Sequence, residues 1–401
     1  MRIHSLIHYS LVLAALMPHM ARAWELSPAD RIAWRDYPSV FQAWYGIDMP
    51  EIPIEAEADR LRAAARHDVI WEESLSQLGE GADLVLGVVW DHKHKGLGTS
   101  FTAESRTKAL ANRKALLRHN PNMVMLMEIR WRDAPSDFLP EDSDWWLRDE
   151  EGEPVVGWTG GWTPFWMLNY ENPGFQDNVA RQARIAIESG IFDGIMLDWS
   201  GHLEIVRKVR AAIGEEALII VNIHDKIEDG KKYAPYINGS FMECNPRDAT
   251  APVNRNPTTW DSLRDGLVWF EENLRQPTLN CLEVWGDRED LSRMRAATTL
   301  GLVYSNGSVL YGDPNPLPTP DHLHDWYGFW DQPLGRPSGN RRVRPDGAVE
   351  REFTGGLVVY NEAGNGAVTV EFDKDRVRAS DGLRGTRFTL ADRDGEIFLY
   401  P

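Results

Sequence analysis

The chain has 401 residues and a formal net charge of −18 at pH 7. This much negative charge repels nucleic acid and anionic lipid headgroups, so neither is an expected partner. A polyanionic substrate is disfavoured for the same reason, unless a local basic patch overrides the average charge.

The first 23 residues have the features of a signal peptide. Arg2 supplies a positive start, residues 10–17 are largely apolar, and Ala21-Arg22-Ala23 places small residues where a signal peptidase cleaves. A membrane span needs about 20 apolar residues, and this run is much shorter. We therefore expect a cleaved signal peptide, a mature chain that begins near Trp24, and a secreted or periplasmic protein. No later segment of the sequence is long and apolar enough to be a predicted membrane span.

Between residues 40 and 313, apolar runs of strand length alternate with amphipathic helical stretches. This alternation is typical of βα units that build a parallel sheet. The predicted strands are residues 40–45, 69–72, 84–90, 123–129, 194–197, 218–222, 240–243, 278–284 and 309–312. The predicted helices are residues 55–66, 103–119, 174–189, 203–213, 259–274 and 288–302. A (β/α)8 TIM-like barrel has eight strands, so one of the nine candidates, near the start, is extra or merges with a neighbour.

The pattern changes after residue 313. Residues 314–345 are rich in Pro, Gly, His and Trp, and are predicted to form a long loop over the barrel mouth. Short alternating runs separated by turn residues then predict a small antiparallel, β-sandwich-like domain over residues 346–401. A barrel of this class takes about 250 residues. One barrel over residues 24–345 with an appended β domain therefore fits the length of the chain.

Asp198 ends the sharpest local pattern in the sequence, residues 192–199 (FDGIMLDW). A predicted helix ends before Gly190, and an apolar strand then leads to the acid. In a parallel barrel the carboxyl ends of the strands converge on the active site. An Asp between a strand and a helix is also a common helix cap, so Asp198 by itself is ambiguous.

Three further acids stand at the ends of predicted strands, namely Glu128, Glu243 and Glu283. Burying ionised groups together costs on the order of several kcal/mol unless they are paired or take part in chemistry. Hydrolysis of a glycosidic bond needs a protonated acid and an ionised carboxylate at the bond. We assign Asp198 as nucleophile or base and Glu243 as general acid/base. Glu283 and Glu128 are alternatives for the acid, or groups that bind the substrate.

The chain contains 17 tryptophans, several times a normal share. Sugar rings present apolar C–H faces that stack on indole, and hydroxyls that bind to polar side chains. More than half of the tryptophans are expected in the core. Trp199 and Trp285, next to candidate acids, are the predicted stacking platforms.

Asn222 and His224 follow a strand and are predicted to bind sugar hydroxyls, although a lone His at a strand end is more often a local hydrogen-bond partner.

Two other functions fit parts of the sequence. One is a non-catalytic carbohydrate-binding barrel that keeps the cleft without the chemistry. The other is a metal-dependent hydrolase built on His92 and His94, which is disfavoured because Lys93 and Lys95 would repel a dication. No metal is expected for this reason, and no cofactor is expected because the sequence has no phosphate-binding glycine loop.

The two cysteines, Cys244 and Cys281, are predicted to be buried and unpaired. If the strand-end glutamates face the barrel interior, Cys281 faces inward because it lies two residues before one of them. Cys244 directly follows the other glutamate and therefore faces outward. The segment 322–326 (HLHDW) either pins the mouth loop or carries a ligand-binding His, and the first is favoured.

Several segments resemble a known group of sequences. They are residues 67–70 (HDVI), 192–198 (FDGIMLD), 241–243 (FME), 306–313, 322–335 and 353–361. Together they resemble the glycoside-hydrolase-like barrels known as "hypothetical glycosyl hydrolases", which are distantly related to α-galactosidase-like and polygalactosaminidase-like barrels. The resemblance implies a barrel, with Asp198 after the fourth strand and Glu243 as its partner acid, and it implies no particular substrate. The Trp-rich residues 131–166 have no counterpart in the resemblance and are candidates for setting specificity.

We expect the exported protein to begin at Trp24, because signal peptidase cleaves after small residues at the −3 and −1 positions. N-terminal sequencing of protein collected outside the cytoplasm measures this directly. Exported protein that still carries Arg2 would contradict the prediction.

Overall fold

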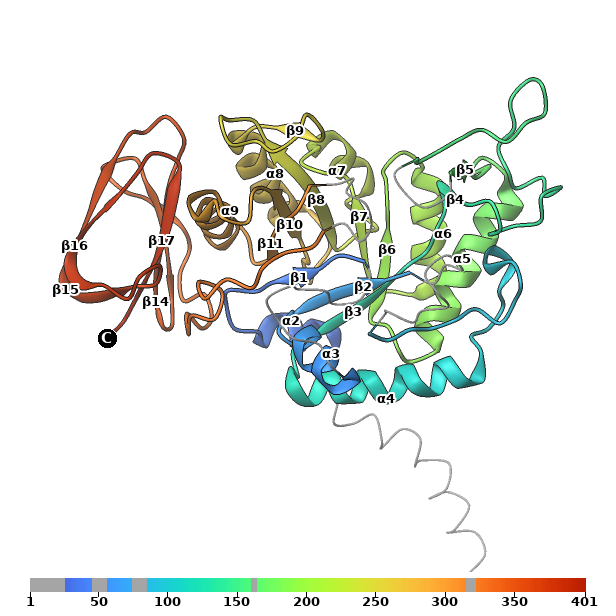
Figure 1. Cartoon of the computed structure of the whole chain (residues 1–401), viewed down its shortest axis with the longest axis horizontal. Coiled ribbons are helices and arrows are strands. Elements are labelled where there is room, and N and C mark those ends of the chain that lie inside the picture. Colours follow the sequence, from blue (N-terminus) through green and yellow to red (C-terminus); the bar gives the residue numbers. More distant parts are fainter. Residues whose placement is uncertain (1–25, 45–55, 74–84, 160–163, 315–321) are drawn as a thin grey trace, which may run out of the picture.

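The computed structural model describes residues 26–44, 56–73, 85–159, 164–314 and 322–401. Eight parallel strands form a barrel (Figure 1), in the order β1 (Phe41–Gln42), β2 (Val69–Glu72), β3 (Val124–Glu128), β6 (Gly194–Leu197), β7 (Leu218–Asn222), β8 (Gly239–Pro246), β10 (Cys281–Trp285) and β11 (Ser308–Gly312). The ring closes between its first and last strands, because Val40 pairs with Val309 and the Val309 amide donates to the Ser39 carbonyl at 2.9 Å. The predicted (β/α)8 barrel is confirmed.

Helices connect the strands and cover the outside of the barrel. They are α3 (Glu57–Ala64), α4 (Ala103–His119), α5 (Pro173–Glu188), α6 (Leu203–Ile213), α7 (Ile227–Tyr233), α8 (Trp260–Asn273) and α9 (Leu291–Tyr304), and α2 (Pro28–Trp34) precedes β1. The six predicted helices are present within three residues of their expected ends, whereas the short α2 and α7 were not predicted. Asn172 caps α5 by accepting the amides of Gly174 and Phe175, which explains why a helix starts at that Asn-Pro sequence. Among the helices described, none combines the length and the apolar character needed to cross a bilayer.

The predicted strand at residues 84–90 is wrong. Its described part, residues 85–90, is a loop between β2 and α4. The Glu72 carboxylate accepts hydrogen bonds from the amides of Val85, Leu86 and Gly87 at 2.6–3.1 Å, so these amides are not available to a strand ladder. This segment was the extra member of the nine candidates.

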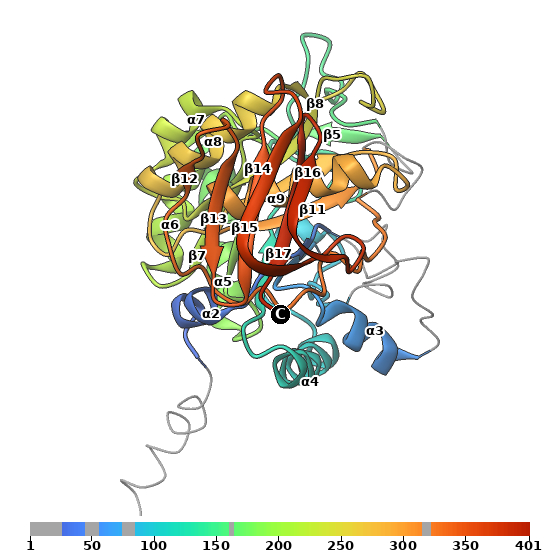
Figure 2. The same ribbon diagram turned by 90° about the vertical axis from the view of Figure 1, so that its left-hand side faces the viewer.

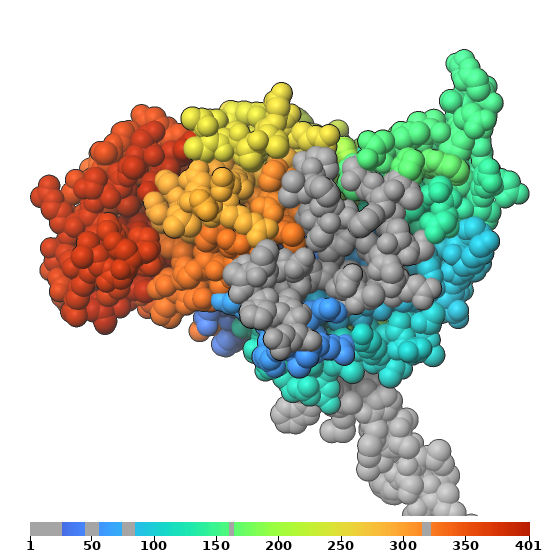
Figure 3. Space-filling model, in the orientation of Figure 1, coloured from blue at the N-terminus to red at the C-terminus, as the bar shows by residue number. Residues whose placement is uncertain are grey.

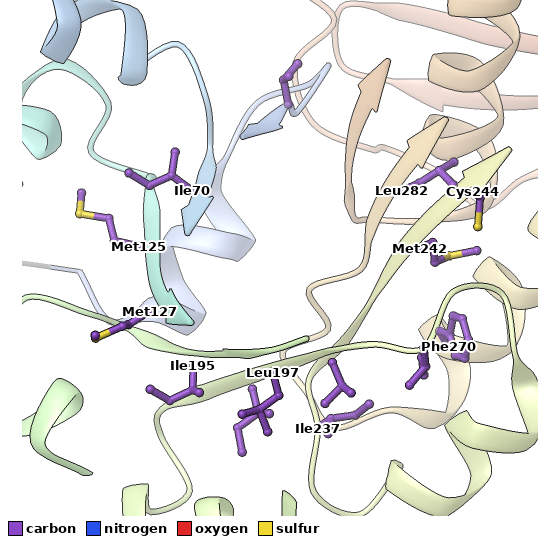
Figure 4. Packing of buried hydrophobic residues seen from close by; sticks show 14 of the residues in the cluster. Ile70, Met125, Met127, Ile195, Leu197, Ile237, Met242, Cys244, Phe270 and Leu282 are labelled. Atoms are coloured by element: carbon purple, nitrogen blue, oxygen red, sulfur yellow. The ribbon is translucent and has the colours of Figure 1, made fainter. Parts of the chain in front are cut away.

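Side-chain alternation divides the barrel core into two layers. Inward-facing side chains form one cluster, which includes Phe41, Trp71, Leu126, Met196, Ile220, Phe241, Cys281 and Leu310. Outward-facing side chains pack against the helices in a larger cluster, and Figure 4 shows some of them, including Met125, Ile195, Leu197 and Cys244. Cys281 therefore faces inward and Cys244 outward, and both are buried and unpaired, as predicted.

A six-stranded antiparallel sheet follows the barrel. Its order is β12 (Arg342–Val343), β13 (Val349–Phe353), β14 (Gly356–Asn361), β17 (Asp394–Leu399), β15 (Val368–Arg378) and β16 (Arg384–Leu390). The sheet lies at one end of the molecule beside α9 (Figures 1 and 3), and Figure 2 views it in front of the barrel. It has its own apolar cluster, which includes Val359, Val370, Phe388 and Phe398. The predicted C-terminal antiparallel β domain is thus present, and its first strand starts at Arg342.

Two small sheets complete the fold near the barrel mouth. Within the Trp-rich residues 131–166, β4 (Asp133–Pro135) pairs antiparallel with β5 (Phe165–Met167). Beside β8, the short strand β9 (Pro257–Thr258) pairs in parallel through Asn245 and Pro246. Both additions place loop residues over the carboxyl ends of the strands.

Asp193 belongs to the same motif as Asp198 but lies at the opposite, amino end of β6. Its carboxylate pairs with Arg31 and Arg113, and the three side chains are 2–8% exposed. It also accepts the amide of Met125 at 2.9 Å. The next residue must be glycine, since a Cβ on Gly194 would lie 2.4 Å from the Leu218 carbonyl oxygen. This end of the motif holds β6 in the barrel.

We expect Asp193→Ala to lower the free energy of unfolding by about 3–5 kcal/mol, because it leaves two buried guanidinium groups without their carboxylate. Chemical denaturation measures the loss. Asp177→Ala is the matched control, since the Asp177 carboxylate that pairs with Lys208 is 71% exposed and loss of such a pair costs about 1 kcal/mol or less. Equal losses in the two variants would contradict the prediction.

Candidate active site

A cavity of about 310 Å³ lies at the carboxyl ends of the barrel strands. Its wall is made by Trp44, Glu73, Arg130, Asp133, Trp158, Phe165, Asp198, Trp199, Asn222, His224, Lys226, Glu243, Arg255, Asn256, Trp285 and His322. Six of the eight predicted site residues are in this wall, and they are Asp198, Glu243, Asn222, His224, Trp199 and Trp285. Glu128 and Glu283 are not in it.

The position of the acids follows from alternation along the strands. Met196 faces the barrel interior, so Asp198, two residues further on, faces the same way above it. The same step leads from Phe241 to Glu243 and from Ile220 to Asn222. The apolar inner core therefore ends in a polar layer at the carboxyl end of the barrel.

The side-chain amide of Asn222 joins the two predicted catalytic acids. Its Nδ2 donates to Asp198 Oδ1 at 2.9 Å and to Glu243 Oε2 at 3.0 Å. Because one nitrogen reaches both acceptors, these two oxygens are at most about 6 Å apart. Asn222 Oδ1 is buried and has no hydrogen-bond partner within the described part of the chain, so it remains available to a ligand.

The two acids differ in their protonation. Burial raises the pKa of Glu243 to about 8; His322 acts against this rise, and the charges of Glu283 and Asp198 add to it. Burial also raises the pKa of Asp198, but Arg130 and the hydrogen bond from Asn222 act in the opposite direction. The Trp199 amide additionally donates to Asp198 Oδ1 at 3.0 Å. Glu243 is therefore largely protonated at neutral pH, while the contacts of Asp198 favour its ionised form.

Arg130 is surrounded by carboxylates on one side of the cavity. Its Nε lies 2.7 Å from Glu73 Oε2 and 3.3 Å from Glu128 Oε1, and its Nη1 lies 3.9 Å from Asp133 Oδ1. Burial lowers the pKa of Arg130, but Glu128 and Glu73 outweigh it and raise the pKa above its ordinary value. Arg130 therefore remains a cation and neutralises much of this acidic group.

The predicted substrate contacts of Glu128 and Glu283 are not supported by their positions. Glu128 lies behind the wall, where it accepts the indole N–H of Trp44 and pairs with Arg130. Glu283 is fully buried, and both of its carboxylate oxygens contact Nδ1 of His322, at 2.9 and 3.0 Å. Neighbouring groups occupy both carboxylates, so they act on the cavity through Arg130 and His322.

The mouth segment 322–326 places its two histidines in different surroundings. His324 pins the segment, since its Nε2 lies 3.0 Å from Nε2 of His67 and both rings are fully buried. His322, two residues earlier, lines the cavity with a backbone φ of 61°. The structural interpretation therefore holds for His324, whereas ligand binding by His322 stays a prediction.

Both predicted stacking tryptophans line the cavity in different ways. Trp199 is 40% exposed, and the Arg132 guanidinium lies 3.5 Å from the centroid of its ring. Trp285 is buried, and its indole N–H has no hydrogen-bond partner among the described residues. An unpaired buried donor at a cavity wall is a ready partner for a ligand hydroxyl.

His92 and His94 do not form a metal site with these acids. His92 lines a separate surface hollow with Lys93 and Lys95, and His94 Nδ1 binds the Asp137 carbonyl at 2.9 Å. Across the described ranges, no group of three or more His, Cys, Asp or Glu side chains is arranged to hold a metal ion. The metal-dependent alternative therefore has no supporting site among the residues that the structure describes.

Sequence reasoning missed several cavity residues. Glu73 could have been predicted, because alternation along the strand makes it face the barrel interior like Val69 and Trp71. Asp133, Lys226 and Arg255 could not have been predicted, since they lie in loops or short added strands whose path depends on tertiary contacts.

Comparisons with known proteins support the fold. No protein-family model matches the chain, and no curated protein matches it significantly. An alpha-amylase from Lactobacillus plantarum superposes with a TM-score of 0.53 and 13% identity, covering 93% of this chain and 100% of that one. An alpha-amylase from Malbranchea cinnamomea gives a TM-score of 0.53 and 13% identity, covering 93% and 97%. At such identities the likeness shows the fold alone, which is the barrel fold of these glycoside hydrolases and agrees with the predicted resemblance.

We expect Glu243→Gln to gain stability relative to the wild type as the pH rises. The folded-state pKa of about 8 lies above the ordinary value of 4.5, so the contribution of Glu243 is fully present below about pH 4.5 and is lost as the pH rises through about 8. The uncharged Gln escapes this loss. Thermal denaturation at about pH 5 and pH 9 measures the difference.

The matched control is Glu371→Gln, which changes a 63%-exposed side chain in the C-terminal sheet. Its stability difference from the wild type should be nearly the same at both pH values. A Glu243→Gln difference that is equally independent of pH would refute the raised pKa.

Proposed function

We propose that the protein is a glycoside hydrolase that cleaves O-glycosidic bonds of a poly- or oligosaccharide with retention of configuration, using Asp198 as nucleophile and Glu243 as general acid/base. The observation that carries the proposal is the Asn222 amide shared by the two carboxyl groups. The bound of about 6 Å on their oxygen atoms is near the separation of about 5–5.5 Å typical of retaining glycosidases, and it leaves little room for the water used by inverting ones.

In the first step, the ionised Asp198 attacks the anomeric carbon. Protonated Glu243 donates its proton to the glycosidic oxygen, so the bond breaks and the leaving sugar departs as an alcohol. In the second step, the Glu243 carboxylate removes a proton from water. That water attacks the anomeric carbon, the bond to Asp198 breaks, and the free carboxylate and protonated Glu243 are regenerated.

The surrounding residues support this division of roles. The raised pKa of Glu243 supplies a proton at neutral pH, and Asn222 holds both carboxyl groups in register. Trp199, which is 40% exposed, offers a surface for the apolar face of a sugar ring, and the buried indole N–H of Trp285 is placed to donate to a sugar hydroxyl. We also propose, from the N-terminal sequence, that the enzyme acts outside the cytoplasm.

We expect Asp198→Asn and Glu243→Gln each to reduce kcat by about 10³-fold or more, because each removes a group that makes or breaks a bond in the reaction. Glu243→Gln should lose much less activity on an aryl glycoside whose leaving group needs no proton. A hydrolysis assay on a panel of glycans and aryl glycosides measures both effects.

The control variant is Asp177→Asn, which removes a 71%-exposed carboxylate on α5, outside the cavity. It should retain wild-type turnover. Turnover that survives both substitutions in the cavity would eliminate the mechanism. Glycan binding without turnover by the wild type would favour the non-catalytic carbohydrate-binding alternative.

A further inference from the structure

Two cations in the cavity wall, Lys226 and Arg255, have no side-chain partner among the described residues. Both are exposed, and neither side chain has a hydrogen bond, ion pair or ring contact with another residue of the described ranges. Arginines in the described ranges are otherwise almost all engaged in such contacts. Arg118, at the end of α4, is the other described arginine that lacks one. Two cations without a protein partner in one cavity therefore suggest that a bound ligand supplies their partner.

The two cations lie in loops that are hydrogen-bonded to the backbone of Glu243. His224 Nδ1 donates to the Glu243 carbonyl at 2.8 Å, and the Asn256 side chain donates to the same oxygen at 3.2 Å. Lys226 lies two residues after His224, and Arg255 directly precedes Asn256. The loops that carry the two cations are thus tied to the same carbonyl of the acid/base residue.

The anchoring residues adopt an unusual backbone conformation. His224 has a φ of 53° and Asn256 a φ of 42°, a region that non-glycine residues rarely occupy. Asn245 on β8 adds two more ties, because its amide donates to the Asn256 carbonyl at 2.9 Å and its Nδ2 donates to the Arg255 carbonyl at 3.1 Å. Such conformations persist where the surroundings over-determine them, and they concentrate at functional sites.

Charge is unevenly distributed around the cavity. Glu73 and Asp133 lie near Arg130, which neutralises much of their charge. Glu243 is largely protonated at neutral pH, so it does not neutralise the cations beside it. Lys226 and Arg255 are therefore the charged side chains that the loops after β7 and β8 contribute to the cavity wall, within a chain whose net charge is −18.

We infer that the substrate is an anionic saccharide, and that Lys226 and Arg255 bind its carboxylate or sulfate group next to Glu243. The inference rests on the proposed function and specifies its substrate class. A neutral sugar would leave both cations unused, whereas an anionic group would form charge-assisted hydrogen bonds with them. The overall negative charge does not prevent this, since charges farther away than about 8 Å are largely screened at physiological salt.

Matched pairs of glycans test the inference. Each pair consists of an anionic oligosaccharide and its neutral counterpart. Examples are an oligogalacturonide with its methyl ester, and a sulfated oligosaccharide with its desulfated form. Binding is measured by calorimetry in the Asp198→Asn background, so that turnover does not interfere. The variants are the double substitution Lys226→Gln with Arg255→Gln and, as the matched control, Arg118→Gln.

We expect at least one anionic member to bind about tenfold or more tightly than its neutral counterpart. The double substitution should remove this difference and leave the neutral affinity unchanged, while Arg118→Gln should change neither. The preference should also weaken as salt rises from about 50 mM to about 500 mM, because both cations are exposed. A preference within the uronate pairs identifies a carboxylate, and one within the sulfated pairs identifies a sulfate ester.

Three results would overturn the inference: equal affinity within every pair, a preference that survives the double substitution, or no binding of any anionic member. Hydrolysis of the same panel by the wild-type protein shows whether a negative result concerns the anionic substrate class or the hydrolase activity itself. Turnover of neutral members without a charge preference would refute only the substrate class. Charge-selective binding without any turnover would refute only the hydrolase activity.

Discussion

The closed parallel barrel forces side chains to alternate between its interior and its helix-covered exterior, and the rest of the structure depends on this constraint. Inward positions are apolar through most of the barrel, from Phe41 and Trp71 to Met196 and Phe241. One step further toward the carboxyl ends, the inward positions become acids and an amide. Because all eight strands run in the same direction, this change occurs at one end only. The barrel interior is therefore filled with apolar side chains, and a polar cavity lies at the carboxyl ends of its strands.

A layer of buried acids is stable only when each acid has partners or is neutral, since an unpaired buried charge costs on the order of several kcal/mol. Glu73 and Glu128 pair with Arg130, and Glu283 contacts His322. Asp198 and Glu243 share one amide donor, and burial keeps Glu243 largely protonated. Of these acids, Asp198 and Glu243 line the cavity, whereas Glu128 and Glu283 lie outside its wall.

Stability and the proposed chemistry are separated along the strands. On β6, Asp193 holds the amino end through two buried arginines, while Asp198 projects into the cavity at the other end. The C-terminal sheet packs on α9, and the Arg295–Asp394 ion pair joins the two. Beyond β11, the Trp330 indole donates to Thr298 of α9, and His324 is hydrogen-bonded to His67. These contacts fix the segment that presents His322 to the cavity.

The sequence by itself determined the barrel, the C-terminal β domain and the position of Asp198 at a strand end. These features follow from local periodicity, because a period of two marks strands, a period of 3.6 marks helices, and a strand end has a known place in a parallel barrel. Only the tertiary structure decided which acids face the cavity, because Trp44 binds Glu128 and His322 binds Glu283 from distant parts of the chain. It also brought Glu73, Lys226 and Arg255 to the site and assigned residues 85–87 to Glu72 rather than to a strand. Those outcomes depend on competition between groups far apart in sequence, which no local pattern records.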